Sequence, residues 1–244
     1  MSELTIASFN VHWGRGPRRS GWAPFDVVDA CKQLDADVVV LQEIWAPDDD
    51  PSQHDAVSAA LGAEAVVVPL GRAVVEPKMR MVSRADASET RQGAGDWCLV
   101  LLSRLPITST DVIALPQLWL DPSSRAVLRV EIDVDGRPLQ LAATHFSHLE
   151  FGSALQARAL RRALPPVDQP GVLVGDMNMW GWTISAMAPD GWQRAVRGKT
   201  WPARRPSHQI DHLLVTDQVA VVESEVLPDL GSDHRPIRAR LRLR

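Results

Sequence analysis

The chain has few cysteines and no long apolar runs. None of its 244 residues belongs to an apolar run of about 18 residues, the length that a membrane-spanning helix requires, so no membrane span is expected. Its start lacks the basic and apolar regions of a signal peptide, which predicts a cytoplasmic protein. The two cysteines, Cys31 and Cys98, form no spacing motif, and no Cys/His cluster has the spacing of a zinc site. We therefore expect free, buried thiols.

Lysine is also scarce, and the chain is not basic. It has 3 Lys against 23 Arg and a net charge of −4, which argues against a globally basic nucleic-acid binder. The arginine guanidinium is nonetheless better suited than the lysine ammonium to bind phosphate, because it can donate two hydrogen bonds to it at once. Apolar residues make up 45% and charged residues 23%, as in ordinary globular proteins. Because no repeat, low-complexity segment or linker interrupts it, residues 1–244 are predicted to form a single domain, with no obligate protein partner evident.

Short apolar or alternating segments predict many strands and few helices. Strands are expected at residues 4–9, 37–42, 65–68, 99–102, 107–114, 125–134, 139–143, 172–174, 210–215, 219–226 and 237–244. Helices are expected at residues 23–34, 52–61 and 149–164. Residues 210–215 and 219–226 are predicted to pair with each other, and the polar region 71–95 is read as a strand pair with a mobile connection. This pattern favours layered sheets with helices outside.

The stretch Gly175-Asp176-Met177-Asn178 follows one of the buried strands. If the backbone stays extended, Asp176 and Asn178 share a face. The carboxylate could then hold or deprotonate a water, and the amide could donate to a developing oxyanion. A plain turn is the ordinary alternative for such a pair.

Other strand ends or starts carry the same kind of polar group. Each one alone is typical of a turn, a cap, a solvated charge or a structural histidine. Together they predict convergence on one rim: Asn10, Glu43, His145, Asp176 with Asn178, Asp211 with His212, and Asp233 with His234. Oxygen ligands from Asn10, Glu43 and Asp233 suit Mg²⁺ or Mn²⁺. The histidines and the Asp/Asn pair would supply acid, base and oxyanion contacts for attack on phosphorus.

An ordered set of motifs then resembles a known superfamily, the endonuclease/exonuclease/phosphatase enzymes, which are Mg²⁺-dependent phosphoesterases and include deoxyribonuclease I and exonuclease III-type nucleases. The matching stretches, in the family's order, are SFNVHWG, VVVLQEIW, LLSRLPI, AATHFSH, VLVGDMNMW, QIDHLLV and GSDHRPI. The resemblance implies an α/β fold, a four-layer α/β/β/α sandwich in which two mixed β-sheets pack face to face with helices outside.

The resemblance also implies a set of residue roles. Asn10 and Glu43 would bind the metal, with Asp233 contributing. His145 would contact the scissile phosphate and could protonate the leaving oxygen, and Asn178 would steady the phosphate. Asp176 would position or activate the attacking water, His234 would act as base or phosphate ligand, and Asp211 would orient the His234 ring. The general base stays open between Asp176 and His234.

Three positions depart from the family pattern. His12 stands where some members carry a metal-binding carboxylate, which leaves a second metal site doubtful. Leu99 replaces an Asn that is common just before the LLSR-type motif. No carboxylate partner for His145 can be identified from the sequence.

Aromatic and basic residues near the motifs bear on the substrate. Ordinary packing or a stacking wall would both account for Trp13, Trp45, Trp180, Trp182 and Trp201. Solvated surface or an anionic substrate would account for Arg15, Arg18, Arg19, Arg204, Arg205 and Arg235. A phosphodiesterase or nuclease is the first expectation, with a phosphate-ester substrate that includes nucleic acid among its candidates. A small-molecule or lipid-headgroup phosphoesterase is second, and a non-catalytic phosphate-binding module is third.

Overall fold

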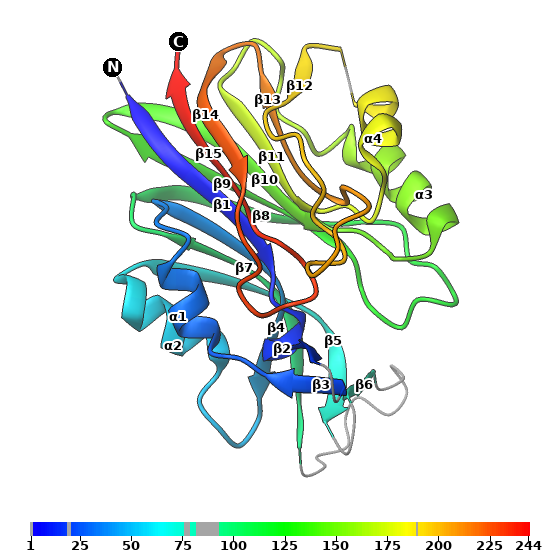
Figure 1. Cartoon of the computed structure of the whole chain (residues 1–244). Helices are drawn as coiled ribbons and strands as arrows, with labels where there is room; N and C mark the ends of the chain where they lie inside the picture. The colour runs from blue at the N-terminus through cyan, green and yellow to red at the C-terminus, as the bar shows by residue number, and fades with distance from the viewer. Residues whose placement is uncertain (1, 19–20, 76–78, 82–92, 189) are drawn as a thin grey trace.

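The computed structural model describes residues 2–18, 21–75, 79–81, 93–188 and 190–244. Two mixed sheets face each other, with helices on both outer sides (Figure 1). The seven-stranded sheet runs β14 (Val219–Val226), β15 (Ile237–Leu243), β1 (Glu3–Asn10), β4 (Val38–Pro47), β7 (Ala94–Ser103), β5 (Glu64–Val75) and β6 (Met79–Met81). The six-stranded sheet runs β12 (Trp192–Arg194), β13 (Asp211–Thr216), β11 (Gly171–Asp176), β10 (Arg137–His145), β9 (Ala126–Val134) and β8 (Ile107–Ala114).

The helices form the outer layers. The seven-stranded sheet is covered by α1 (Val27–Lys32) and α2 (Gln53–Leu61), and the six-stranded sheet by α3 (Glu150–Leu160) and α4 (Gly181–Met187) (Figure 1). A short helical turn, η1 (His12–Gly14), and a small hairpin of β2 (Arg15–Arg18) and β3 (Gly21–Pro24) follow β1. Within these described ranges, no helix has the length and apolarity needed to cross a bilayer. The predicted four-layer fold is confirmed.

Central strands are apolar on both faces because each face is buried. In β1, Leu4 and Ile6 pack into the core between the sheets, whereas Ala7 and Phe9 pack under α1. In β11, Val172 and Val174 belong to the core between the sheets, and Leu173 packs toward α3. A strand with two buried faces reads as a continuous apolar run, and the sequence shows such runs here.

One predicted strand pairing and the bounds of two predicted helices were wrong. Residues 210–215 and 219–226 do not pair, because β13 joins β11 and β12 in one sheet while β14 joins β15 in the other. The first helix is shorter than residues 23–34: Asp26 caps it by accepting from the Asp29 N–H at 2.9 Å, and residues 21–24 form β3. The third ends at Leu160 rather than at residue 164. In the region 71–95, β5 and β7 pair, but residues 76–78 and 82–92 lie outside the described residues.

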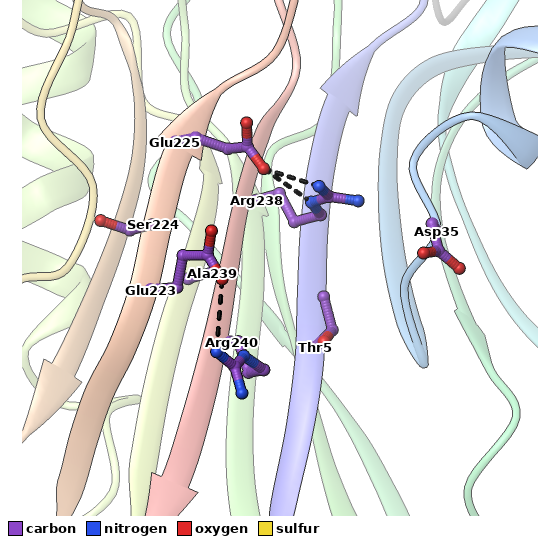
Figure 2. A pocket seen from close by; sticks show the side chains of 8 residues that line it. All are labelled: Thr5, Asp35, Glu223, Ser224, Glu225, Arg238, Ala239 and Arg240. Carbon is purple, nitrogen blue, oxygen red and sulfur yellow. Dashed lines mark hydrogen bonds and ion pairs between the residues drawn. The ribbon is translucent and has the colours of Figure 1, made fainter.

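A hollow of about 180 Å³ lies on the outer face of the seven-stranded sheet, away from the polar strand ends (Figure 2). Its charges pair across neighbouring strands. Arg238 NH2 lies 2.6 Å from Glu225 Oε1, and Arg240 NH2 lies 3.3 Å from Glu223 Oε2 (Figure 2). Exposed pairs of this kind contribute roughly 0–1 kcal/mol each to stability. We therefore read this surface as an ion-pair ladder without further chemistry.

Gly175 fixes the approach of β11 to β10, and replacing it should be costly. It has φ 146°, and a Cβ there would lie 1.9 Å from the Thr144 carbonyl oxygen. We expect Gly175→Ala to lower the free energy of unfolding by about 3 kcal/mol or more, measured by urea denaturation. Gly136→Ala is the matched control, since Gly136 also has a positive φ (79°) but open space around it, and should lose only about 1–2 kcal/mol. Equal losses would contradict the steric argument.

Candidate active site

Asn10, the last residue of β1, connects the polar ends of the two sheets. Its Nδ2 donates to Glu43 Oε1 and to Asp176 Oδ2, each at 3.0 Å. Its Oδ1 accepts from the His12 N–H at 3.0 Å. Ser232 Oγ in turn donates to the Asn10 carbonyl at 2.8 Å. Strand ends that are distant in sequence therefore meet at this buried amide.

Glu43 reaches the site from within a strand, not from its end. β4 continues to Pro47, but its register against β7 shifts between Leu41 and Ile44. At this bulge Glu43 has φ 57°, a left-handed conformation that is strained for a residue with a side chain. The bulge changes the direction of the side chain, and the carboxylate lines a cleft. The expectation that the strand ends before Glu43 was wrong.

His145 and Asp176 come from adjacent parallel strands. The register of β10 and β11 pairs them directly. His145 Nε2 lies 3.6 Å from Asp176 Oδ2 and 3.8 Å from Glu43 Oε1. All three groups therefore face the same small volume.

Asn178 does not continue an extended strand, as the expectation of a shared face required. Its φ is 49°, and its N–H donates to Asp176 Oδ1 at 2.9 Å, which makes a turn closed by the Asp side chain. Its Nδ2 donates to the Phe146 carbonyl at 3.0 Å and lies 3.5 Å from His145 Nε2. The turn, not a common strand face, brings Asn178 to the cleft.

His234 is oriented by Asp211. Its Nδ1 lies 3.0 Å from Asp211 Oδ2, and its Nε2 lies 3.8 Å from Asp176 Oδ2. Asp211 is paired with Asp176 in the antiparallel register of β11 and β13. His212, the next residue along β13, points to the other face, where its Nε2 hydrogen-bonds the Met179 carbonyl at 2.8 Å. His212 is thus structural.

Asp233 lies at the edge of the same cleft. Its Oδ2 accepts from Trp201 Nε1 at 3.2 Å, and its Oδ1 lies 3.3 Å from Ser232 Oγ. Among the predicted aromatic and basic residues, Trp13 also lines the cleft, and Arg15 lies over the Trp13 ring at 5.4 Å. Arg235 instead donates to the Ala203 carbonyl at 2.7 Å, and Arg19 lies outside the described residues.

Burial and neighbouring charges shift the pKa values of His145, Asp176 and His234 in different directions. Burial lowers the pKa of His145 well below its usual value, and Arg125, His234 and His148 lower it further. Burial raises the pKa of Asp176 to about 7, with Asp211 adding to the rise. Burial alone would lower the pKa of His234, but Asp211 and Asp176 outweigh it and hold that pKa well above its usual value. At neutral pH the site thus contains a protonated imidazole beside a carboxylate near its own pKa.

The cleft has a volume of about 390 Å³, and six of its lining residues were missed by the sequence reasoning: Trp97, Asp121, Pro122, Ser123, Arg125 and His148. Arg125 is buried, with its Nε 3.0 Å from Asp121 Oδ2 and its guanidinium 5.0 Å from the centre of the Trp97 ring. Among the described residues, His145 Nδ1 has no hydrogen-bond partner, so no carboxylate there orients the ring through this atom; the Asp176 and Glu43 carboxylates lie near Nε2 instead. Arg125 opens a predicted strand, and nothing local distinguishes it from a surface arginine.

The donor set fits a divalent cation that prefers oxygen ligands. Asp176, Asp211 and His234 offer ligand atoms that all lie within 4.8 Å of one another, and Glu43 and Asp233 line the same cleft. Asn10 as oriented presents its amide nitrogen to the carboxylates. It would bind a cation through oxygen only after its carboxamide turned over.

Comparisons with known proteins agree with this geometry. Residues 7–234 match the Endonuclease/Exonuclease/phosphatase family. An endonuclease/exonuclease/phosphatase from Beutenbergia cavernae is 22% identical with a TM-score of 0.78, over 100% of this chain and 72% of that one. The mannosyl-6-phosphatase Bt3783 of Bacteroides thetaiotaomicron is 16% identical (TM-score 0.68; 98% and 100% covered), and the human Nocturnin catalytic domain with bound sulfate is 15% identical (0.67; 100% and 94%). No curated protein sequence matches the chain.

Proposed function

The chain belongs to the endonuclease/exonuclease/phosphatase family of phosphoester hydrolases, and we propose on that premise that it is a phosphodiesterase that depends on Mg²⁺ or Mn²⁺. The observation that carries the proposal is the convergence of Glu43, His145, Asp176 and His234 on one cleft. Glu43 and Asp233 would hold the cation, with Asn10 contributing once its carboxamide turns. When bound, the cation would neutralise charge on the phosphoryl group.

The chain's own residues would accept the proton of the attacking water and bind the phosphate. Asp176, with a pKa near 7, is suited to accept the proton of the attacking water at neutral pH. His234, held protonated by Asp211, would donate to a phosphoryl oxygen. His145 Nε2 and Asn178 Nδ2 lie 3.5 Å apart and would contact the same phosphate. We therefore assign the general base to Asp176 and phosphate binding to His234, with Asp211 as the positioning residue.

A substrate panel tests this proposal. We expect the purified protein to hydrolyse bis(p-nitrophenyl) phosphate in Mn²⁺ or Mg²⁺, and we expect nicking of supercoiled plasmid if the substrate is DNA. Hydrolysis of the small diester without nicking would favour a small-molecule or lipid-headgroup substrate. No hydrolysis of either with several metals would support a phosphate-binding module instead.

A lipid-headgroup substrate is the second candidate, and one specific observation favours it. Large apolar side chains are exposed beside the cleft, among them Trp182 and Trp180, which line a hollow that shares Asn178 with the cleft.

The clustered carboxylates and histidines argue against the binding module, because phosphate binding alone does not require two buried histidines and a carboxylate of raised pKa.

A further inference from the structure

An apolar surface covers α3, α4 and the chain that precedes Asp121. We call it the α3–α4 surface and define it by Leu118, Trp119, Leu120, Leu155, Trp180, Trp182 and Met187. Trp119 is 91% exposed, Trp182 68% and Leu120 60%. Single exposed apolar residues are common, but a contiguous patch of large ones marks an interaction site. The chemistry proposed for the cleft does not explain why these apolar side chains are exposed.

The surface is continuous with the catalytic cleft. Asn178 lines both the cleft and a hollow of about 310 Å³ that Trp180 and Trp182 also line. Ala154 lines both that hollow and a larger one of about 590 Å³ over α3 and α4, where Leu118, Leu155 and Met187 lie. A substrate held at the phosphate site could therefore extend over apolar surface without a break.

Contacts of α3 with the preceding loop and with α4 fix the elements that carry this surface. A Cβ on Gly152 of α3 would lie 2.0 Å from Leu118 Cδ1, so the loop packs directly on the helix. The buried Gln156 accepts from the Ser147 N–H at 2.8 Å and donates to the Pro116 carbonyl at 3.1 Å. Arg161 NH2 donates to the Met187 carbonyl at 3.0 Å and joins the ends of α3 and α4. These contacts fix the chain next to Trp119 and Leu120, which are exposed.

The chemistry of this surface suits an anionic lipid surface better than a nucleic acid. In the described part of the chain, no carboxylate lines either hollow, whereas Arg158 and Arg161 line the larger one. Exposed tryptophans and basic side chains around aliphatic groups match the headgroup region of a bilayer. Trp119, Trp180 and Trp182 offer an aromatic face to a bilayer interface and to a nucleobase alike, whereas the aliphatic Leu118, Leu155 and Met187 offer a nucleobase neither a hydrogen bond nor an aromatic face.

We infer that the α3–α4 surface docks on anionic membranes and brings a phosphodiester headgroup into the cleft. This inference rests on the proposed hydrolase function and narrows its substrate to phospholipid headgroups. Trp119 and Leu120 enter the interfacial layer, and Arg158 lies against the anionic headgroups.

Vesicle binding by the full chain tests the docking surface without turnover. The protein should float with vesicles of phosphatidylcholine and phosphatidylserine. Trp119→Ala combined with Leu120→Ala should weaken that binding by about 10- to 100-fold, because two large apolar side chains no longer leave water. Arg158→Gln should weaken binding to these vesicles by about fivefold and leave binding to pure phosphatidylcholine vesicles unchanged. Val112→Ala combined with Val221→Ala is the matched control, since both residues are exposed apolar groups on β8 and β14, away from this surface, and it should bind like the wild type.

Hydrolysis of soluble bis(p-nitrophenyl) phosphate separates the two proposals. It should be unchanged in the Trp119→Ala/Leu120→Ala protein, so lost vesicle binding with retained hydrolysis supports docking. Wild-type protein that hydrolyses the soluble diester but does not bind vesicles overturns docking alone. Equal vesicle binding by the double variant and the wild type also overturns it. So does a double variant that loses affinity for a single-stranded oligonucleotide but not for vesicles, which would assign the surface to nucleic acid.

Discussion

His234→Ala is expected to lower kcat for bis(p-nitrophenyl) phosphate by about 10³-fold, within the range for removal of a positioned hydrogen-bond donor to a developing oxyanion. The ring lies between Asp211, at 3.0 Å from Nδ1, and Asp176, at 3.8 Å from Nε2, so its loss removes a positive charge from between two carboxylates. The measurement is steady-state hydrolysis with the metal in excess, paired with thermal unfolding to exclude a folding defect.

Asp211→Asn separates positioning from direct contact. Asp211 raises the pKa of His234, so its loss should lower that pKa, and the imidazolium should deprotonate at lower pH. The alkaline limb of the rate profile should then move to lower pH, while activity at acidic pH is largely retained. Because the two residues act as a unit, the double variant should lose little more than His234→Ala alone. Additive losses, or an unchanged profile, would contradict the assigned roles.

Much of the fold could be predicted from the sequence because its central strands are buried on both faces, whereas its more exposed strands β8 and β14 are rich in β-branched residues. β8 and β14 occupy exactly the predicted ranges, residues 107–114 and 219–226. The hairpin at Asp135-Gly136 joins β9 to β10, as its turn residues indicate. Strand pairing was harder: residues 210–215 and 219–226 are separated by only a short turn, as in a hairpin, yet that turn passes from one sheet to the other.

From the sequence, the residues of the site could be predicted only as polar side chains at the ends of strands. Asn10, His145, Asp176 and His234 do converge, because ends of adjacent strands meet at one rim. The bulge at Glu43 could not be predicted, since its left-handed conformation depends on the register against β7. Arg125 was missed for a similar reason: a buried arginine is recognised by the Asp121 and Trp97 side chains around it, and these contacts are tertiary.

The contacts of Arg125 also contribute to the lowered pKa of His145. Arg125 NH1 lies 3.5 Å from the His145 carbonyl, and the guanidinium lies over Trp97, whose ring is 5.1 Å from the imidazole. Burial is the main cause of the low pKa of His145, and the nearby Arg125 cation lowers that pKa further. At neutral pH His145 is therefore neutral, whereas His234 is protonated, and the two histidines are not interchangeable.

Chelation is expected to have the other large effect. EDTA should reduce hydrolysis of the soluble diester by about 10³-fold or more, because charge developing on the phosphoryl group would lose its cation. Glu43→Gln keeps the size of the side chain and an oxygen that can accept from Asn10 Nδ2, but removes its negative charge. This variant should need about 10- to 100-fold more Mn²⁺ for half-maximal activity.

Thermal unfolding gives a readout that does not depend on turnover. Wild-type protein should melt at a higher temperature as Mn²⁺ is added, because a ligand that binds only the folded state stabilises it, and Glu43→Gln should shift much less. Glu225→Gln is the matched control, since Glu225 pairs with Arg238 on the outer face of the seven-stranded sheet, away from the cleft. Full hydrolysis in EDTA would rule out the cation, and an Mn²⁺ response of Glu43→Gln equal to that of the wild type would place the cation on other ligands. The cluster of Asp176, Asp211 and His234 would then be the next set to test, because its ligand atoms already lie within 4.8 Å of one another.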